Sequence, residues 1–368
     1  MAARPVVPTA AQLRAAEAGC DRFIAGHGRR TAERFLATIP VDAELDVYGD
    51  GGVVAALEAD VATLLEKPAA LFLPSGTMAQ QATLRIHADA RGRRSVVFHP
   101  TCHLDTSEER AYERLHGLVG IPVGPATEPL TIERLKAVRE PFGSLVLELP
   151  QRALGGTLPS FAELDAMCQW ARRRGAAVHL DGARLFEAAP YYQATAKASI
   201  AKVAALFDTV YVSFYKGLGG IAGSCVAGSK EVIGELSAWR TRHGGRLFGL
   251  WPYAASARTV LAERQPKMGA YYRRAKAIGA ALGALEGVEV LPTPVQSPLL
   301  HIRIAGERAV IARRMYDLAT ERGIWSFARP FMTEGPALQR FEMTVGDATM
   351  ALSVDEVVDA FTWIAHGH

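Results

Sequence analysis

Cysteine is scarce in this chain of 368 residues, which has only Cys20, Cys102, Cys168 and Cys225. They are far apart, form no C-x-x-C pair and lie in no cluster of metal ligands, so we expect neither a disulfide scaffold nor a metal site. Also missing is a run of about 18 apolar residues, the length that a membrane helix needs. The first ten residues lack the apolar stretch of a signal peptide. We therefore expect a cytoplasmic protein without membrane contacts.

A strong excess of one charge sign is absent as well. The sequence has 41 Lys and Arg against 38 Asp and Glu, a formal net charge of +3, and we expect no nucleic-acid partner from so small a value. The hydrophobic fraction of 49% excludes disorder and collagen-like repeats. The length corresponds to about two domains. What remains is an α/β enzyme or a scaffold protein of that size.

The pattern of apolar residues divides the chain into three parts. Residues 1–45 are predicted to form an N-terminal helical arm, with helical spacing over residues 11–38. In residues 46–255 short apolar strands alternate with helices, which is typical of an α/β domain with a mostly parallel sheet covered on both faces. Residues 256–368 are predicted to be a smaller α+β domain that contains most of a long helical stretch over 254–286.

The predicted elements can be located by residue number. The strands are expected at residues 69–73, 95–98, 117–123, 144–149, 176–180, 209–214, 224–227, 299–304 and 340–345. The other helices are expected at residues 53–65, 80–90, 132–139, 161–174, 200–206 and 310–322.

Two polar residues stand at the ends of predicted strands, where open α/β sheets bind ligands. Lys216 runs into the glycine-rich turn 217–220, which leaves space around the ammonium, and such a lysine can form a Schiff base. The alternative is a surface lysine at a strand–loop junction. Asp181 closes the strand 176–180 and can face a protonated ring nitrogen of a cofactor, or else simply cap a helix.

A third motif joins the strand 69–73 to the following helix. It consists of Ser75, Gly76 and Thr77. Backbone N–H groups at a helix start, with two hydroxyls beside them, suit a phosphate monoester. The alternative is an ordinary capped helix start.

A fourth motif follows the strand 95–98. Either His99 or His103 can lie over an aromatic cofactor or transfer a proton there, and a surface loop histidine is the alternative. Cys102 stands between them, but no basic environment or orienting group in the sequence supports a nucleophilic thiol.

The order of these motifs and their residues resemble those of the threonine aldolase and β-eliminating lyase family. Its members are pyridoxal-phosphate enzymes of the aspartate-aminotransferase fold, fold type I, so the resemblance implies a large cofactor domain and a small C-terminal domain. The similarity extends from about residue 46 to 235 and more loosely to the C-terminus. The matching segments are 46–50, 72–78, His103 with Glu108, 180–186, 215–219 and 223–224.

The resemblance assigns the cofactor to residues that already stand out. It implies that Lys216 holds pyridoxal 5'-phosphate as a Schiff base, that Asp181 pairs with the pyridine nitrogen and that His103 stacks on the ring. The residues that would face the phosphate are Ser75, Gly76 and Thr77.

The resemblance also implies a site for a substrate carboxylate. Arg184 would lie beside the cofactor and this carboxylate, and a C-terminal arginine would clamp it. Arg340 matches that position best, with Arg329 as a rival, and a guanidinium suits bidentate carboxylate binding.

Family members assemble as dimers or tetramers with shared active sites, so a homodimer or homotetramer is expected. Arg240, Arg242 and Arg246 are candidates to reach a neighbour's phosphate, although a solvated helix face is the alternative.

Three departures from the family pattern bear on the substrate. Residues 1–45 lack the usual Arg-Ser-Asp segment, and Glu108 is followed by Glu109-Arg110 instead of two glycines. Where threonine aldolases carry Glu-Asn-Thr-His, this chain has Glu148-Leu-Pro-Gln151. Glutamine cannot serve as a general base, so another group or a water must take the proton of a β-hydroxyl.

The leading hypothesis is an aldolase that cleaves a β-hydroxy-α-amino acid into glycine and an aldehyde. Gln151 favours a substrate with a bulkier or aryl β-substituent, such as phenylserine, and is predicted to lie near it. The alternatives with the same cofactor are β-elimination, transamination and racemisation. A non-catalytic scaffold is a third hypothesis, against which Lys216, Asp181 and His103 argue.

Overall fold

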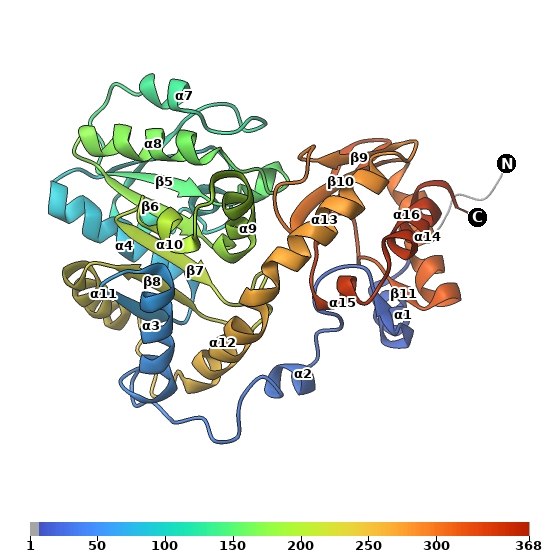
Figure 1. Cartoon of the computed structure of the whole chain (residues 1–368), viewed down its shortest axis with the longest axis horizontal. Coiled ribbons are helices and arrows are strands. Elements are labelled where there is room, and N and C mark those ends of the chain that lie inside the picture. Colours follow the sequence, from blue (N-terminus) through green and yellow to red (C-terminus); the bar gives the residue numbers. More distant parts are fainter. Residues whose placement is uncertain (1–6, 368) are drawn as a thin grey trace. The chain divides into compact units, whose positions relative to one another are not determined.

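The computed structural model describes residues 7–367, which form two compact units (Figure 1). The smaller unit contains the described residues up to Thr31, Leu154–Thr157 and the residues from Lys267 on, and the larger contains Ala32–Ala153 and Leu158–Pro266. The chain thus changes unit at 31/32 and 266/267, whereas the sequence pattern placed domain boundaries at 45/46 and 255/256. Residues 1–6 of the predicted arm lie outside the described part.

A seven-stranded sheet forms the centre of the larger unit. Its order is β2 (Ala69–Leu73), β8 (Ser224–Gly228), β7 (Thr209–Ser213), β6 (Ala177–Gly182), β5 (Ser144–Glu148), β3 (Ser95–Phe98) and β4 (Val119–Pro122). The strands from β7 to β4 are parallel, and β8 is antiparallel to both of its neighbours. The predicted mostly parallel sheet and its seven strands are confirmed.

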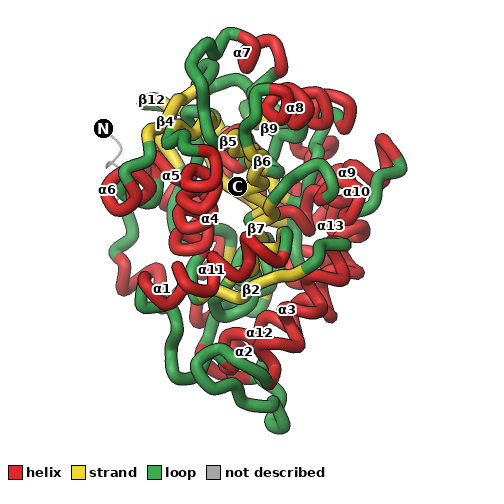
Figure 2. The backbone as a smooth tube through the Cα atoms, turned by 90° about the vertical axis from the view of Figure 1, so that its left-hand side faces the viewer, coloured by secondary structure: helices red, strands yellow, loops and turns green. Residues whose placement is uncertain are grey.

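Helices lie on both sides of this sheet (Figure 2). Helices α4 (Gly76–Arg91) and α11 (Lys230–Arg242) cover one face, while α3 (Gly52–Leu65) and α8 (Phe161–Arg173) cover the other. Strands β5 to β8 are almost wholly buried as a result, which explains their continuous apolar sequences. The remaining helices of this unit are α2 (Ala32–Leu36), α5 (His103–Thr106), α6 (Ala111–His116), α7 (Ile132–Lys136), α9 (Leu185–Ala196), α10 (Ile200–Ala204) and α12 (Trp251–Arg264).

The helical stretch predicted over 254–286 is not one helix. Helix α12 ends at Arg264 and α13 (Met268–Leu282) begins after a short 3-10 turn at Gln265–Lys267. Pro266 explains the break, because its nitrogen carries no hydrogen for the helix ladder and its ring clashes with the preceding turn. The change of unit falls at the same place.

The smaller unit has its own antiparallel sheet, in the order β12 (Met332–Gly335), β13 (Leu338–Thr344), β10 (Leu299–Ala305) and β9 (Val288–Leu291). The predicted α+β character and the strands at β10 and β13 are confirmed, whereas β9 and β12 are too short and mixed in sequence to be recognised. The unit also contains a two-stranded sheet of β1 (Arg22–Phe23) and β11 (Ile324–Trp325). Its other helices are α1 (Ala10–Gly19), α14 (Arg308–Arg322), α15 (Asp347–Met350) and α16 (Val354–His366).

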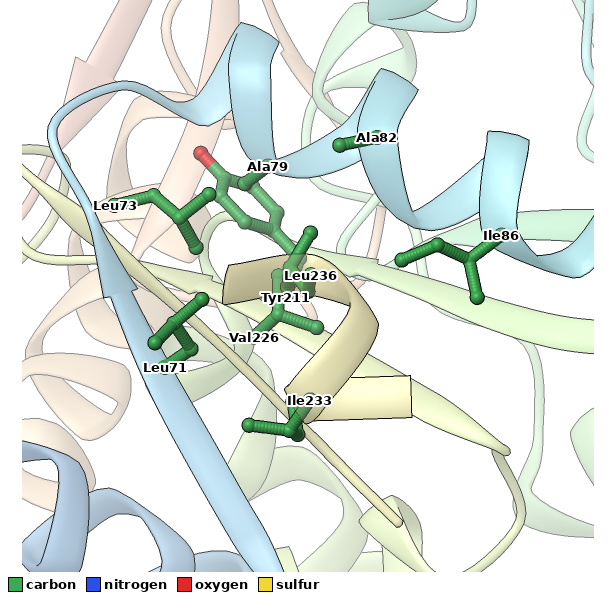
Figure 3. Packing of buried hydrophobic residues seen from close by; sticks show 9 residues of the cluster. All are labelled: Leu71, Leu73, Ala79, Ala82, Ile86, Tyr211, Val226, Ile233 and Leu236. Carbon is green, nitrogen blue, oxygen red and sulfur yellow. The ribbon is translucent and has the colours of Figure 1, made fainter. Parts of the chain in front are cut away.

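Helix α4 is held against the sheet by a buried apolar cluster (Figure 3). Ala79, Ala82 and Ile86 recur along α4 at helical spacing and face the sheet and α11. The other buried members are Leu71, Leu73, Tyr211, Val226, Ile233 and Leu236. This packing fixes the start of α4 directly after β2.

Among the described residues, no helix is long and apolar enough to span a membrane.

Candidate active site

A cavity lies at the carboxyl ends of the parallel strands of the larger unit. Its lining residues are Gly76, Thr77, Gln80, His103, Glu108, Glu148, Arg152, Asp181, Ala183, Arg184, Tyr211, Tyr215 and Lys216. The parallel register explains why they meet, because Glu148 at the end of β5 pairs with Asp181 on β6, and β7 leads into the loop that carries Lys216. Most of the residues that the sequence singled out therefore surround one cavity.

His103 lines the cavity and is oriented by a buried carboxylate. Its Nδ1 lies 2.8 Å from Oε1 of Glu108, and this hydrogen bond raises the pKa of His103, favouring the protonated ring. The competing His99 points elsewhere: its Nε2 lies 2.8 Å from the carbonyl oxygen of Glu128, and its Nδ1 lies 2.8 Å from Oγ1 of Thr101. The structure thus brings His103 to the site and leaves His99 in a structural role.

Asp181 and Glu148 are neighbouring carboxyl groups in the floor of the cavity. Asp181 is buried, its Oδ1 accepts a hydrogen bond from the Ala183 N–H at 3.2 Å, and burial raises its pKa. Burial also raises the pKa of Glu148, to about 7, and the nearby Asp181 acts in the same direction. Oε1 of Glu148 accepts from the backbone N–H of Arg152 at 3.1 Å.

The lining residues that have no assigned role in the sequence analysis include Gln80, Glu148 and Arg152. Glu148 had a recognisable signal, because it ends a buried strand next to the one that ends in Asp181. Gln80 stands one helical turn after Gly76 and is 1% exposed, so a polar residue on the buried face of α4 was the available clue. For Arg152 the sequence offers no comparable signal.

The start of helix α4 forms one wall of the cavity. Ser75 caps the helix, with its Oγ accepting from the Met78 N–H at 3.2 Å, and it is exposed and absent from the lining. Gly76 and Thr77 do line the cavity. Gly76 leaves no room for a side chain, because a Cβ there would lie 2.1 Å from Oη of Tyr211. The first N–H groups of a helix have no carbonyl partner within it, so the start of α4 at Gly76 and Thr77 suits an anion.

Lys216 and Arg184 bring two cationic side chains to the cavity. Nζ of Lys216 lies 4.9 Å from the ring centre of Tyr215. Next to it Gly217 touches Glu187 so closely that a Cβ would meet Oε1 at 2.0 Å. Nε of Arg184 lies 3.8 Å from the same Oε1. Burial raises the pKa of Glu187 to about 7, while Arg184 opposes the shift.

The other predicted substrate ligands lie outside the cavity lining. Gln151 is buried but does not line it, and its neighbour Arg152 does. Arg340 belongs to the smaller unit, where its Nη1 lies 3.0 Å from Oε1 of Glu334. Arg329 is exposed in the same unit. Their roles toward a substrate remain predictions.

Of the three arginines considered for intersubunit contacts, Arg240 requires a correction. It is 2% exposed, and its Nη1 donates to the carbonyl oxygen of Phe72 at 3.0 Å, so it neither reaches a neighbour nor lies on a solvated face. Arg242 and Arg246 are exposed. Nη2 of Arg246 bonds to Asp50 at 2.8 Å.

The cysteines of this chain and its potential metal ligands can be compared with the predictions. Burial raises the pKa of Cys102 well above its ordinary value, which keeps this thiol protonated. All four cysteines are free and buried. In the part of the chain that the structure describes, a search for three or more His, Cys, Asp or Glu side chains able to hold one metal ion found no such group.

Comparison with known proteins decides the family. The sequence profile of the β-eliminating lyases matches residues 28–305, well over half of the chain. The chain belongs to this family. Together with its similarity to threonine aldolases, this confirms the resemblance and makes the protein a pyridoxal-phosphate-dependent lyase of fold type I.

Three relatives illustrate the similarity. A structure from Listeria monocytogenes, assigned as an L-allo-threonine aldolase, is 34% identical with a TM-score of 0.90, and the match covers 96% of this chain and 98% of the relative. One from Exiguobacterium, assigned as an aromatic amino acid β-eliminating lyase/threonine aldolase, is 36% identical with a TM-score of 0.90 and coverage of 97% and 100%. Low-specificity L-threonine aldolase 1 of Arabidopsis thaliana is 28% identical over 289 residues, which are 76% of this chain and 79% of the relative.

The cavity of this lyase fits pyridoxal phosphate. Lys216 supplies an amine for the cofactor's carbonyl, and the buried carboxyl of Asp181 suits its ring nitrogen. His103 is available for the ring face, and the start of α4 at Gly76 and Thr77 suits the phosphate. Gly76 and Gly217 stand where a Cβ would collide with Tyr211 and Glu187, so neither position accepts a larger residue without movement of these neighbours.

Proposed function

We propose that this lyase cleaves the Cα–Cβ bond of a β-hydroxy-α-amino acid and releases glycine and an aldehyde. The observation that carries the proposal is the convergence of Lys216, Asp181, His103 and Arg184 on one cavity. The near full-length similarity to a structure assigned as an L-allo-threonine aldolase supports this choice of bond.

The residues of the cavity have distinct tasks in this reaction. The bound cofactor supplies an electron sink for the pair released when the Cα–Cβ bond breaks. Lys216 would hold the cofactor through its amine, while Asp181 would hold the ring nitrogen and His103 would support the ring. Arg184 presents a guanidinium to the substrate carboxylate and is itself held by Glu187 at 3.8 Å. Arg340 is proposed as a second carboxylate ligand.

A base must remove the proton of the β-hydroxyl. Gln151 lacks a basic group, and the ion pair with Glu108 favours the protonated form of His103. Glu148 lines the cavity and has a pKa raised to about 7, close to the value that suits a general base at neutral pH. We therefore propose Glu148 as the acceptor of this proton.

The substrate is proposed to carry a bulky or aryl β-substituent, since Gln151 replaces the histidine found in threonine aldolases. The test is aldehyde release by the cofactor-loaded enzyme from the four threonine isomers and from phenylserine. We expect release that is fastest with phenylserine and is abolished in Lys216→Ala. Glu148→Gln should lower kcat strongly while cofactor binding stays unchanged. An enzyme that binds the cofactor but releases no aldehyde from any of these substrates would refute the proposed reaction.

β-Elimination is the second candidate function. The Exiguobacterium structure, which is 36% identical to this chain, is assigned as a β-eliminating lyase/threonine aldolase and supports this candidate. The same enzyme preparation should then produce pyruvate and ammonia from β-chloroalanine. Elimination that is faster than every aldol cleavage in the panel would make it the main activity.

We further propose that the enzyme is a homodimer or homotetramer. Support comes from an exposed apolar surface in the larger unit, made of Leu45, Val47, Tyr48, Leu247 and Phe248. Phe248 is 72% exposed and packs edge-on against Tyr48 with 5.4 Å between ring centres. Patches of this kind mark protein contacts.

Sedimentation tests this assembly. We expect an oligomer that Phe248→Asp dissociates. The matched control is Leu115→Asp, which adds the same charge at a side chain that is 66% exposed on helix α6. A parent protein that sediments as a monomer contradicts the proposal.

The enzyme is proposed to act in the cytoplasm. Four cysteines that are all buried and unpaired suit a reducing compartment. Recovery of the native protein from an exported or membrane fraction would contradict this location.

A further inference from the structure

A line of buried polar side chains extends from Asp181 into the interior of the larger unit. Asp181 and Gln80 line the same cavity, and hydrogen bonding by the Gln80 side chain lowers the pKa of Asp181. Oε1 of Gln80 lies 2.6 Å from Nε2 of His179. Nδ1 of His179 lies 2.8 Å from Oγ1 of Thr209, and the same oxygen lies 2.8 Å from Nε2 of His87. All five residues are at most 3% exposed.

Regular secondary structure places these residues in line. Gln80 and His87 are seven residues apart on α4 and share one helix face, and His179 and Asp181 are two residues apart on β6 and share one sheet face. Thr209 on β7 pairs in register with His179. Helix α4 packs on both β6 and β7, and this packing brings the two residues of the helix against the residues of the strands.

The donors and acceptors allow the hydrogen bonds of this line to run in only one direction. Oε1 of Gln80 is an acceptor, so Nε2 of His179 must donate to it, and the neutral ring then accepts at Nδ1. Thr209 therefore donates its hydroxyl proton to His179 and accepts from Nε2 of His87. The amide nitrogen of Gln80 is left to donate to Asp181.

Both imidazoles are suited to this arrangement because they stay neutral. Burial lowers the pKa of His87 to about 4 and that of His179 to about 3. Arg91 lowers the pKa of His87 further and Asp208 raises it, while the neighbouring His87 ring also lowers the pKa of His179. A neutral imidazole has one donor and one acceptor, so its two hydrogen bonds must point the same way along the line.

We propose that Gln80, His179, Thr209 and His87 are positioning residues that keep the carboxyl of Asp181 ionised for the ring nitrogen of the cofactor. Every hydrogen of the line points toward Asp181. The reverse order would turn the carbonyl of Gln80 toward the carboxyl and require Asp181 to be protonated. The inference depends on the cofactor and not on which substrate bond is cleaved.

Other charged groups face Asp181 and do not replace the line. His103 favours the ionised carboxyl, whereas Glu108 and burial disfavour it. Glu148 stands beside Asp181 on β5. Because burial is the largest of these influences, donated hydrogen bonds from the protein are needed to retain the negative charge.

Thr209 allows a sharply matched test. Thr209→Val keeps the shape and removes only the hydroxyl, while Thr209→Ser keeps the hydroxyl. Both variants are titrated with pyridoxal phosphate and with its 1-deaza analogue, which lacks the ring nitrogen. We expect Thr209→Val to bind pyridoxal phosphate about tenfold more weakly, as the loss of one buried hydrogen bond predicts, and to bind the analogue as the parent does. Thr209→Ser should resemble the parent with both.

A merely structural role gives a different result. If Thr209→Val weakens the two ligands equally, or weakens neither, the proposal is overturned. Thermal unfolding of both variants shows whether the fold is intact. The variants can show the expected pattern while the parent enzyme cleaves no β-hydroxy amino acid. That result would refute the proposed function and leave this inference standing.

The direction of the line can also be observed in the cofactor-free protein. Histidine labelled with ¹⁵N reports by NMR which ring nitrogen carries the proton, and the variants His87→Gln and His179→Gln assign the two signals. We expect a neutral ring with its hydrogen on Nε2 at both positions at neutral pH. A hydrogen on Nδ1 of His179 would overturn the proposal.

Discussion

Adding one methyl group at Gly76 tests how the cavity wall is built. In Gly76→Ala the new Cβ would lie 2.1 Å from Oη and 2.9 Å from Cζ of Tyr211, far inside van der Waals contact. Tyr211 is 3% exposed and packed under α4 (Figure 3), so its ring cannot swing aside and the start of α4 must move. Overpacking of a core costs about 1–3 kcal/mol, and removing a helical glycine returns about 0.5–1 kcal/mol.

The net loss for Gly76→Ala is therefore about 1–2 kcal/mol, or a Tm lower by about 1–3 °C. The assay is thermal unfolding of the cofactor-free protein by circular dichroism at one fixed concentration. Cofactor affinity should fall as well, because the displaced helix start is the proposed phosphate site.

Two variants control for this interpretation. Gly234→Ala on helix α11 meets nothing within 4 Å, so it should leave Tm unchanged or raise it slightly. Adding Tyr211→Phe to Gly76→Ala removes the nearest contact and should recover part of the lost stability. If Gly76→Ala unfolds at the temperature of the parent or above, the packing argument is refuted.

Three further predictions concern the cofactor lysine and a buried ion pair. Lys216→Ala should lose the visible absorption band of the bound cofactor while keeping the parent's circular dichroism, and a retained band would disprove its role. Burial raises the pKa of Glu58 to about 7, so the folded protein binds its proton more tightly than the unfolded chain. The resulting stability is present below pH 4.5 and is lost as the pH rises to about 7, by about 3 kcal/mol, which urea unfolding of Glu58→Gln should show as a flatter pH profile. Arg240→Ala leaves the Phe72 carbonyl and Glu58 without this partner and should cost about 3–5 kcal/mol in the same assay, whereas a purely intersubunit role would leave unfolding unchanged.

Much of the site could be predicted because its residues stand where secondary structure ends. Asp181 and Lys216 follow apolar strands, and the carboxyl ends of parallel strands meet at one edge of a sheet. The same reasoning could have included Glu148, whose strand lies next to that of Asp181. It failed for Arg240, because the sequence of α11 does not reveal that this one arginine faces the carbonyl of Phe72.

Local periodicity and short characteristic segments were enough to predict the mostly parallel sheet, the order of the cofactor motifs and the family. The choice between His99 and His103 required the folded structure, because it depends on whether Glu108 or a distant carbonyl group is near. It alone joined Gln80 to His179, 99 positions later in the chain. Hydrogen bonds of 2.6–2.8 Å require the packing of a helix on a sheet in one register, and local sequence does not specify contacts between segments so far apart.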